Sequence, residues 1–250
     1  MRLRITAISL LFLAACAAPP SVTQIAQSGT GALLLGEQHD APEHQRLHRD
    51  VVDALAARGV LAALALEMAQ QGSSTAGLSP QASEEQVRSA LTWNEGWPWA
   101  AYGPAVMAAV RAGAPVVGAN LPREQMRAAM ADRSLEEFLP GPLLQAQQEA
   151  IRLGHCELLP PSQLAPMTRV QIARDRAMAQ TLVQLQQPGK TVVLLAGAGH
   201  VDTELGVPRY LPAGLERKAV VLPEPIGPRK DYCEDMRRSL ANKPPPDPPR

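Results

Sequence analysis

Five short apolar runs constrain the fold of this chain more than any other feature of its sequence. Each run is four to seven residues long, is bounded by glycine or polar residues, and does not alternate apolar with polar positions. Strands that are buried on both faces have this pattern, because helices cover both sides of a parallel sheet. We therefore predict an α/β fold with a mostly parallel sheet of about five strands, at residues 31–35, 60–66, 115–119, 191–196 and 219–222.

The segments between these runs have helical periodicity. Apolar residues recur at helical spacing within residues 42–58, and further helices are predicted at 102–112, 122–131, 142–154 and 167–187. Residues 121–188 contain no predicted strand, so we expect a helical insert or lid within an α/β domain that spans residues 30–240. Residues 241–250 contain five prolines and are expected to form a disordered tail.

Polar side chains follow the predicted strands at the points where they end. Glu37 and His39 follow the first strand, Glu67 the second, Arg123 the third and His200 the fourth. Carboxyl ends of parallel strands meet at one edge of a sheet, where ligands bind. Taken alone, each residue is compatible with an ordinary solvated or core side chain. Together they suit metal ligation or general acid–base chemistry, since imidazole and carboxylate groups serve both.

A second feature is a cluster of aromatic residues. Four of the eight Trp, Tyr and Phe residues lie within ten positions: Trp93, Trp97, Trp99 and Tyr102. One interpretation is a corner of the fold where the rings fill the core. The other is a wall for a large flat ligand, in which Tyr102 ligates ferric iron, since tyrosine is an established axial ligand of haem.

Three further histidines lie outside these positions. His44 and His48 are four residues apart on the predicted 42–58 helix, and we expect them on a solvated face or at the rim of the site. His155 is adjacent to Cys156. Adjacent side chains point apart, which disfavours a thiolate–imidazole nucleophile there.

The amino terminus has the layout of a secretory signal. Two arginines precede an apolar stretch, residues 5–13, which is far shorter than the ~20 residues of a spanning helix. Leu13-Ala14-Ala15-Cys16 resembles the lipobox of bacterial lipoproteins. This predicts a signal peptide at residues 1–15, diacylation of Cys16 and a tether at residues 16–29. Ala17 after the cysteine favours the outer membrane, facing the periplasm or the surface.

The charge of the chain gives no indication of nucleic-acid binding. The 24 basic and 24 acidic residues give a net charge of zero, and a signal peptide would remove Arg2 and Arg4, leaving −2. The chain has no basic patch of the kind that nucleic acid requires.

Two cysteines, Cys156 and Cys233, remain once Cys16 is assigned to lipid. In an oxidising periplasm a disulfide between them is a hypothesis that their spacing in the sequence alone does not decide.

From residue 31 to residue 212 the chain resembles the ChaN-type haem-binding lipoproteins. The motifs that carry the resemblance are Leu35-Gly36-Glu37-Gln38-His39-Asp40, Leu66-Glu67-Met68, Trp93-Asn94-Glu95-Gly96-Trp97-Pro98-Trp99 with Tyr102, Ala119-Asn120-Leu121-Pro122-Arg123, His155-Cys156, Gln171 with Arg174-Asp175 and Met178-Ala179, Gly197-Ala198-Gly199-His200, and Gly206-Val207-Pro208-Arg209.

This resemblance implies a role in iron or haem uptake and a parallel sheet with a helical subdomain. It also implies a homodimer that holds two haems face to face, with tyrosine on the iron and a histidine of the partner near a propionate. Tyr102 is the preferred iron ligand because of its aromatic neighbours, and Tyr210 is the alternative. The other residues expected around the haem are Trp97, Trp99, His39, His200, Arg123 and His155.

The family is also similar to a superfamily that includes Tiki-type metalloproteases and erythromycin esterases. Their active-site motif matches Gly36 with His39, Glu67 and His200. The resemblance therefore leaves open a metal-dependent or histidine-based hydrolase, with His39 or His200 as base or ligand of a divalent metal. Glu37 or Glu67 would then orient or activate water.

Overall fold

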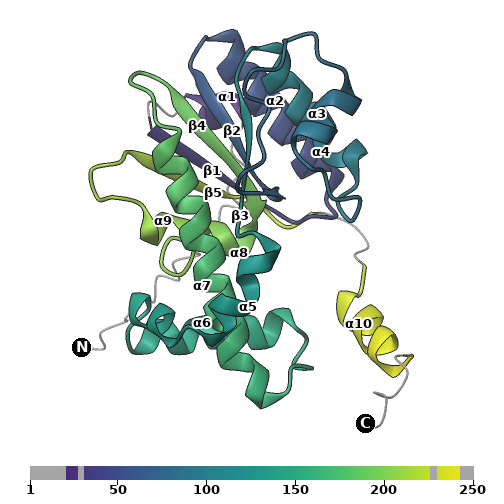
Figure 1. Ribbon diagram of the computed structural model, residues 1–250, viewed down its shortest axis with the longest axis vertical. Coiled ribbons are helices and arrows are strands. Elements are labelled where there is room, and N and C mark those ends of the chain that lie inside the picture. Colours follow the sequence, from purple (N-terminus) through teal and green to yellow (C-terminus); the bar gives the residue numbers. More distant parts are fainter. Residues whose placement is uncertain (1–20, 28–30, 226–229, 243–250) are drawn as a thin grey trace, which may run out of the picture.

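The computed structural model describes residues 21–27, 31–225 and 230–242 (Figure 1). The predicted signal peptide, Cys16 and residues 243–250 of the predicted tail lie outside these ranges. Within the described ranges, no helix has both the length and the apolar character needed to cross a membrane.

The core of the fold is a five-stranded sheet in which every neighbouring pair is parallel, in the order β3-β2-β4-β1-β5. This confirms the predicted α/β class. Three central strands are buried along almost their whole length, as the unalternating apolar runs require. The strands are β1 (Gly31–Glu37), β2 (Leu61–Gln70), β3 (Val116–Asn120), β4 (Thr191–Gly197) and β5 (Arg217–Val221).

Helices cover both faces of this sheet (Figure 1). One face packs against α1 (Val22–Ala26), α2 (Pro42–Ala57), α3 (Glu84–Ala90) and α4 (Trp99–Arg111). The other face packs against the carboxyl half of α7 (Pro161–Gln184) and the short helices α8 (Ala198–Val201) and α9 (Val207–Tyr210).

Residues 121–188 contain helices and no strand. These helices are α5 (Arg123–Ala131), the 3-10 helix η1 (Arg133–Phe138), α6 (Pro142–Gly154) and α7, and a separate apolar cluster holds α5, η1 and α7 together. The long α7 belongs to both parts of the molecule: its amino half lies in this helical subdomain and its carboxyl half lies on the sheet.

The last described helix, α10 (Tyr232–Ala241), contains no buried residue. A disulfide between Cys156 and Cys233 links it to the turn after α6, which confirms the pairing left open by the sequence. Figure 1 shows α10 standing apart from the body of the fold. The covalent bond, rather than packing, therefore attaches this helix.

One element differs from expectation near the amino terminus. Within residues 16–29, expected to be a tether, Val22–Ala26 form α1, which begins at a Ser21–Gln24 capping box. Ile25 of this helix is fully buried in the core on the α2 side of the sheet. The packed domain thus begins earlier than residue 30.

Candidate active site at the strand ends

The carboxyl edge of β1 places Glu37, His39 and Tyr102 in one hydrogen-bonded group. Nδ1 of His39 lies 2.8 Å from Oε1 of Glu37. The hydroxyl of Tyr102, from α4, donates to the same oxygen at 2.6 Å. Because an ionised carboxylate only accepts, Nδ1 of His39 carries the proton, and Nε2 is left as the acceptor of the neutral ring.

Glu67 of β2 is the second centre of the site. It is 3 % exposed, and its Oε2 accepts a 2.7 Å hydrogen bond from the backbone N–H of Gly197. Its Oε1 accepts from Arg174 at 2.6 Å and lies 3.4 Å from Nε2 of His200. Burial alone would raise the pKa of Glu67, but the positive charges of His200 and Arg174 outweigh burial and hold the pKa well below its usual range.

His200 is held between two carboxylates. Its Nδ1 lies 2.5 Å from Oδ1 of Asp175, and its Nε2 faces Glu67. Burial opposes protonation, but the two negative charges outweigh it and raise the pKa of His200 to about 9. His200 is therefore an imidazolium at neutral pH, which compensates two buried carboxylates. We call these seven residues the strand-edge network: Glu37, His39, Glu67, Tyr102, Arg174, Asp175 and His200.

The sequence expectation for His44 and His48 was wrong, because both are buried at 4 % and 1 % exposure. His44 is satisfied by the backbone: its Nδ1 accepts from the N–H of Gln38 and its Nε2 lies 2.9 Å from the carbonyl of Pro223. His48 has Nδ1 3.4 Å from Oε2 of Glu37, and no hydrogen bond to either ring nitrogen within the described residues. Burial lowers the pKa of His48 to about 4.

His39 is the accessible member of the strand-edge network. Its side chain is 38 % exposed, whereas those of Glu37, Glu67 and His200 are at most 6 % exposed. Its Nε2 is 3.9 Å from Glu67, beyond hydrogen-bond distance, and the described residues offer it no other partner. The ring also meets Trp97 edge-on, with centroids 4.8 Å apart. The network thus presents one oriented imidazole to the outside.

A glycine makes room for that imidazole. A Cβ on Gly197 would lie 2.9 Å from Nε2 of His39 and 3.5 Å from Oε2 of Glu67. Its φ of −59° suits any residue, so the requirement for glycine is one of space. The end of β4 therefore fixes how closely His39 approaches Glu67.

The described residues contain no group of three or more His, Cys, Asp or Glu arranged to hold a metal ion. The predicted divalent-metal set of His39, Glu67 and His200 gains no support from the geometry. The physical reason is that Arg174 and His200 already occupy Oε1 of Glu67, where a cation would bind.

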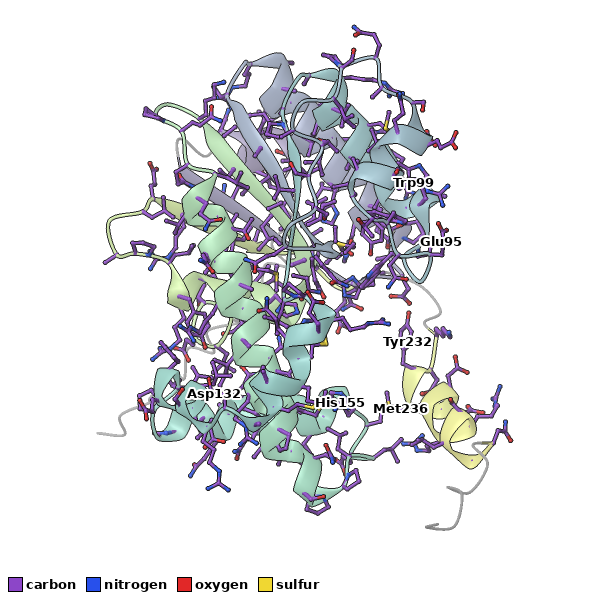
Figure 2. The ribbon with its side chains drawn as sticks, in the orientation of Figure 1. Glu95, Trp99, Asp132, His155, Tyr232 and Met236 are labelled. Atoms are coloured by element: carbon purple, nitrogen blue, oxygen red, sulfur yellow. A yellow bond between two sulfur atoms is a disulfide. The ribbon has the colours of Figure 1, made fainter. Side chains whose placement is uncertain are left out.

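The structure separates other predicted site residues from the network. Arg123 is exposed at the start of α5, and no hydrogen bond or ion pair joins its side chain to the network in the described part of the chain. His155 ends α6, where its Nδ1 lies 2.8 Å from the carbonyl of Ile151. Figure 2 shows His155 among the lower helices, well below Trp99. Trp99 bonds through its indole N–H to Glu84.

Three network partners were not assigned a role from sequence. All three lie on α7. Gln171 and Asp175 are within hydrogen-bond distance of His200, and Arg174 donates to Glu67. Nothing in their local pattern marks them, because a long polar helix carries many such residues. Their presence in the resemblance motifs was the available signal.

Comparison with a solved structure supports the fold. The chain is similar in fold to a solved structure entitled "Cofacial heme binding to ChaN of Campylobacter jejuni", with a TM-score of 0.56 and 22 % identity over 76 % of this chain and 78 % of that chain. A type III effector, HopBA1, aligns with a TM-score of 0.39 and 16 % identity over 73 % and 76 % of the two chains, a likeness too low to inform the fold. No curated protein sequence matches significantly.

A family model gives the assignment. The model described as "Haem-binding uptake, Tiki superfamily, ChaN" matches residues 24–211. This range contains β1 to β4 and every residue of the strand-edge network, and it ends before β5. The chain belongs to the ChaN haem-binding uptake family of the Tiki superfamily.

Proposed function

We propose that this protein is a lipid-anchored haem-binding protein of iron or haem acquisition. In this proposal the haem lies near the carboxyl ends of the strands, against His39 and Trp97, at the interface of a homodimer. Family membership supports the ligand class. The observation that carries the position is the partly exposed ring of His39 at the edge of an otherwise buried network, with an Nε2 that makes no hydrogen bond within the described residues.

The environment of His39 suits a residue that binds iron. Its Nδ1–H is held by Glu37, which fixes the tautomer and leaves Nε2, on the side of Gly197 and Glu67, without a hydrogen bond. Histidines that ligate metals are commonly oriented in this way by a carboxylate on the other ring nitrogen. The Trp97 ring beside the imidazole supplies an apolar surface for a flat macrocycle.

Tyr102, the iron ligand preferred from the sequence, is less accessible than His39. The residue is 1 % exposed and its hydroxyl donates to Glu37. Burial and the charge of Glu37 raise its pKa, which disfavours the phenolate that ferric iron requires. Ligation by Tyr102 remains a prediction that requires this hydrogen bond to open. The described geometry favours His39 as the residue that faces the iron.

A hemin titration of the purified protein tests the haem proposal. We expect a saturable Soret band distinct from that of free hemin, together with a shift of the protein to dimer on size-exclusion chromatography. A spectrum that stays that of free hemin at all ratios would contradict the proposal. Titration of Gln187→Ala provides a control, since Gln187 is exposed and is not among the residues expected around the haem.

One observation favours a second candidate, a histidine-based hydrolase. Glu37 and His39 form a carboxylate–imidazole pair like that of a general base, and the free Nε2 of His39 could take a proton from water. The pKa of His39 is raised, because the hydrogen bond to Glu37 and the charge of Glu67 outweigh its burial. Ester and peptide hydrolysis that is lost in His39→Ala and unaffected by hemin would support this candidate. Absence of any turnover would exclude it for those substrates.

A further inference from the structure

A hollow of about 790 Å³ lies on the far side of α7, between η1 and α9. Its wall contains no residue of the strand-edge network. A volume of this size falls within the range of small-molecule sites, roughly 300–1,000 Å³. The lining residues that matter here are Phe138, Arg176, Gln180, Val183, Arg209 and Tyr210. We call this hollow the α7–α9 cavity.

Two arginines line the α7–α9 cavity and form no salt bridge in the described part of the chain. Arg209 donates one hydrogen bond from its Nε to the carbonyl of Phe138, which leaves its terminal N–H groups free. Arg176 makes no hydrogen bond there. Asp132 interacts electrostatically with Arg176 but forms no ion pair with it in the described part of the chain, and its Oδ1 accepts two hydrogen bonds from Ser134. Two guanidinium groups that converge on one hollow favour acidic groups, which they bind in a planar, two-pronged geometry.

The remaining wall is aromatic and apolar. The guanidinium of Arg176 lies 3.6 Å over the ring of Phe138, which is itself 40 % exposed. Phe138 meets Tyr210 edge-on, with centroids 6.4 Å apart. Val183, also 40 % exposed, extends this surface along α7. Exposed aromatic and aliphatic side chains beside stacked guanidinium groups suit a flat aromatic ligand.

Tyr210 closes the inner wall. Its hydroxyl is buried and has no hydrogen-bond partner within the described residues. Burial and the charge of Asp175 raise its pKa, so the side chain remains a neutral phenol. Tyr210 therefore lines the α7–α9 cavity within electrostatic range of Asp175 of the strand-edge network.

We propose that the α7–α9 cavity is a second ligand site, which takes a planar aromatic molecule carrying two acidic groups. Arg176 and Arg209 bind the acidic groups, and Phe138 and Tyr210 contact the ring system. This site is separate from the proposed haem position at His39 and does not depend on iron.

Metal-free protoporphyrin IX, a planar ring with two carboxylates, is a suitable probe. We expect saturable binding by fluorescence and calorimetry, and affinity lower by roughly tenfold for each arginine lost in the Arg176→Gln/Arg209→Gln double variant. The matched control is Arg111→Gln/Arg127→Gln, which removes the same charge from exposed arginines outside the cavity and should bind as the native protein does. The dimethyl ester of the probe, which lacks both charges, should bind at least tenfold more weakly than the acid.

A second variant tests position without a change of charge. Gln180 is exposed and lines the cavity, so Gln180→Trp should fill the hollow and abolish binding without disturbing the core. Equal affinity of the native protein and the arginine double variant would overturn the proposal, as would equal affinity for acid and ester, or no binding of the probe at all. Probe binding that is lost in the arginine double variant and kept in His39→Gly belongs to the α7–α9 cavity, so these outcomes are distinguishable from failure of the proposed haem site.

Discussion

The hydroxyl of Tyr102 donates a 2.6 Å hydrogen bond to Oε1 of Glu37 inside the core. The same oxygen lies 2.8 Å from Nδ1 of His39, so one buried carboxylate holds both side chains. Glu37 therefore determines two properties at once: Tyr102 stays a neutral, internal phenol, and the partly exposed His39 ring keeps its proton on Nδ1 and its Nε2 unprotonated when neutral.

Replacement of Tyr102 by phenylalanine tests this arrangement. Loss of a donor to a buried carboxylate should lower the free energy of unfolding by about 1–3 kcal/mol. If His39 faces the iron, the hemin Soret band should persist in Tyr102→Phe. Urea unfolding and a hemin titration measure the two effects, and disappearance of the band from a folded Tyr102→Phe variant would identify Tyr102 as the ligand.

Gly197→Ala should block the site without unfolding the domain. The added Cβ would lie 2.9 Å from Nε2 of His39, in a backbone conformation open to alanine. We expect hemin affinity to fall by an order of magnitude or more while the circular dichroism spectrum is retained. The matched control is Gly199→Ala, where a Cβ has no neighbour within 4 Å. Equal loss of affinity in the two variants would contradict the role of Nε2.

The pH dependence of stability should report on His200. Its pKa rises from 6.5 to about 9 on folding, so the native state binds more protons than the unfolded state between these values. The free energy of unfolding should therefore fall as pH rises from 6.5 to 9, by up to about 3 kcal/mol. Chemical denaturation across this range should show the full fall in the native protein and in His155→Gln, and a much smaller fall in His200→Gln, where only the raised pKa of His39 still contributes. A His200→Gln profile parallel to the native one would refute this assignment.

Lipid attachment can be tested at Cys16. In a bacterial host that processes lipoproteins, we expect the native protein in the membrane fraction, with the mass of a diacylated Cys16 at its amino terminus. Cys16→Ser should move the protein to the soluble fraction, since stable anchoring requires two or more acyl chains. Unchanged membrane association of Cys16→Ser would show that another feature holds the protein there.

The sequence predicted the sheet well because burial on both faces leaves a strong local signal. Strand ends were less certain: β2 continues to Gln70, although the polar Glu67 suggested an earlier end. The long α7 begins at Pro161 and not at residue 167. A proline is favourable in the first turn of a helix, as at Pro161, and α7 also contains Pro166 without ending there. Tertiary packing decided these boundaries.

The site was predictable where chemistry follows a strand and not where it comes from a distant helix. Glu37, His39, Glu67 and His200 meet at one edge, as their positions after parallel strands implied. Asp175 arrives from α7 with no local pattern to mark it. The burial of His44 and His48 had a readable signal that was missed, because both lie on the stripe of α2 that also carries the buried Val51.

The central claim is that the free Nε2 of His39 faces haem iron. The most direct measurement is the hemin absorption spectrum of His39→Gly, recorded with and without added imidazole. The account predicts that the variant loses the Soret band of the native complex, and that free imidazole restores it by entering the space that the side chain vacates. A variant that retains the native spectrum without imidazole would contradict the claim.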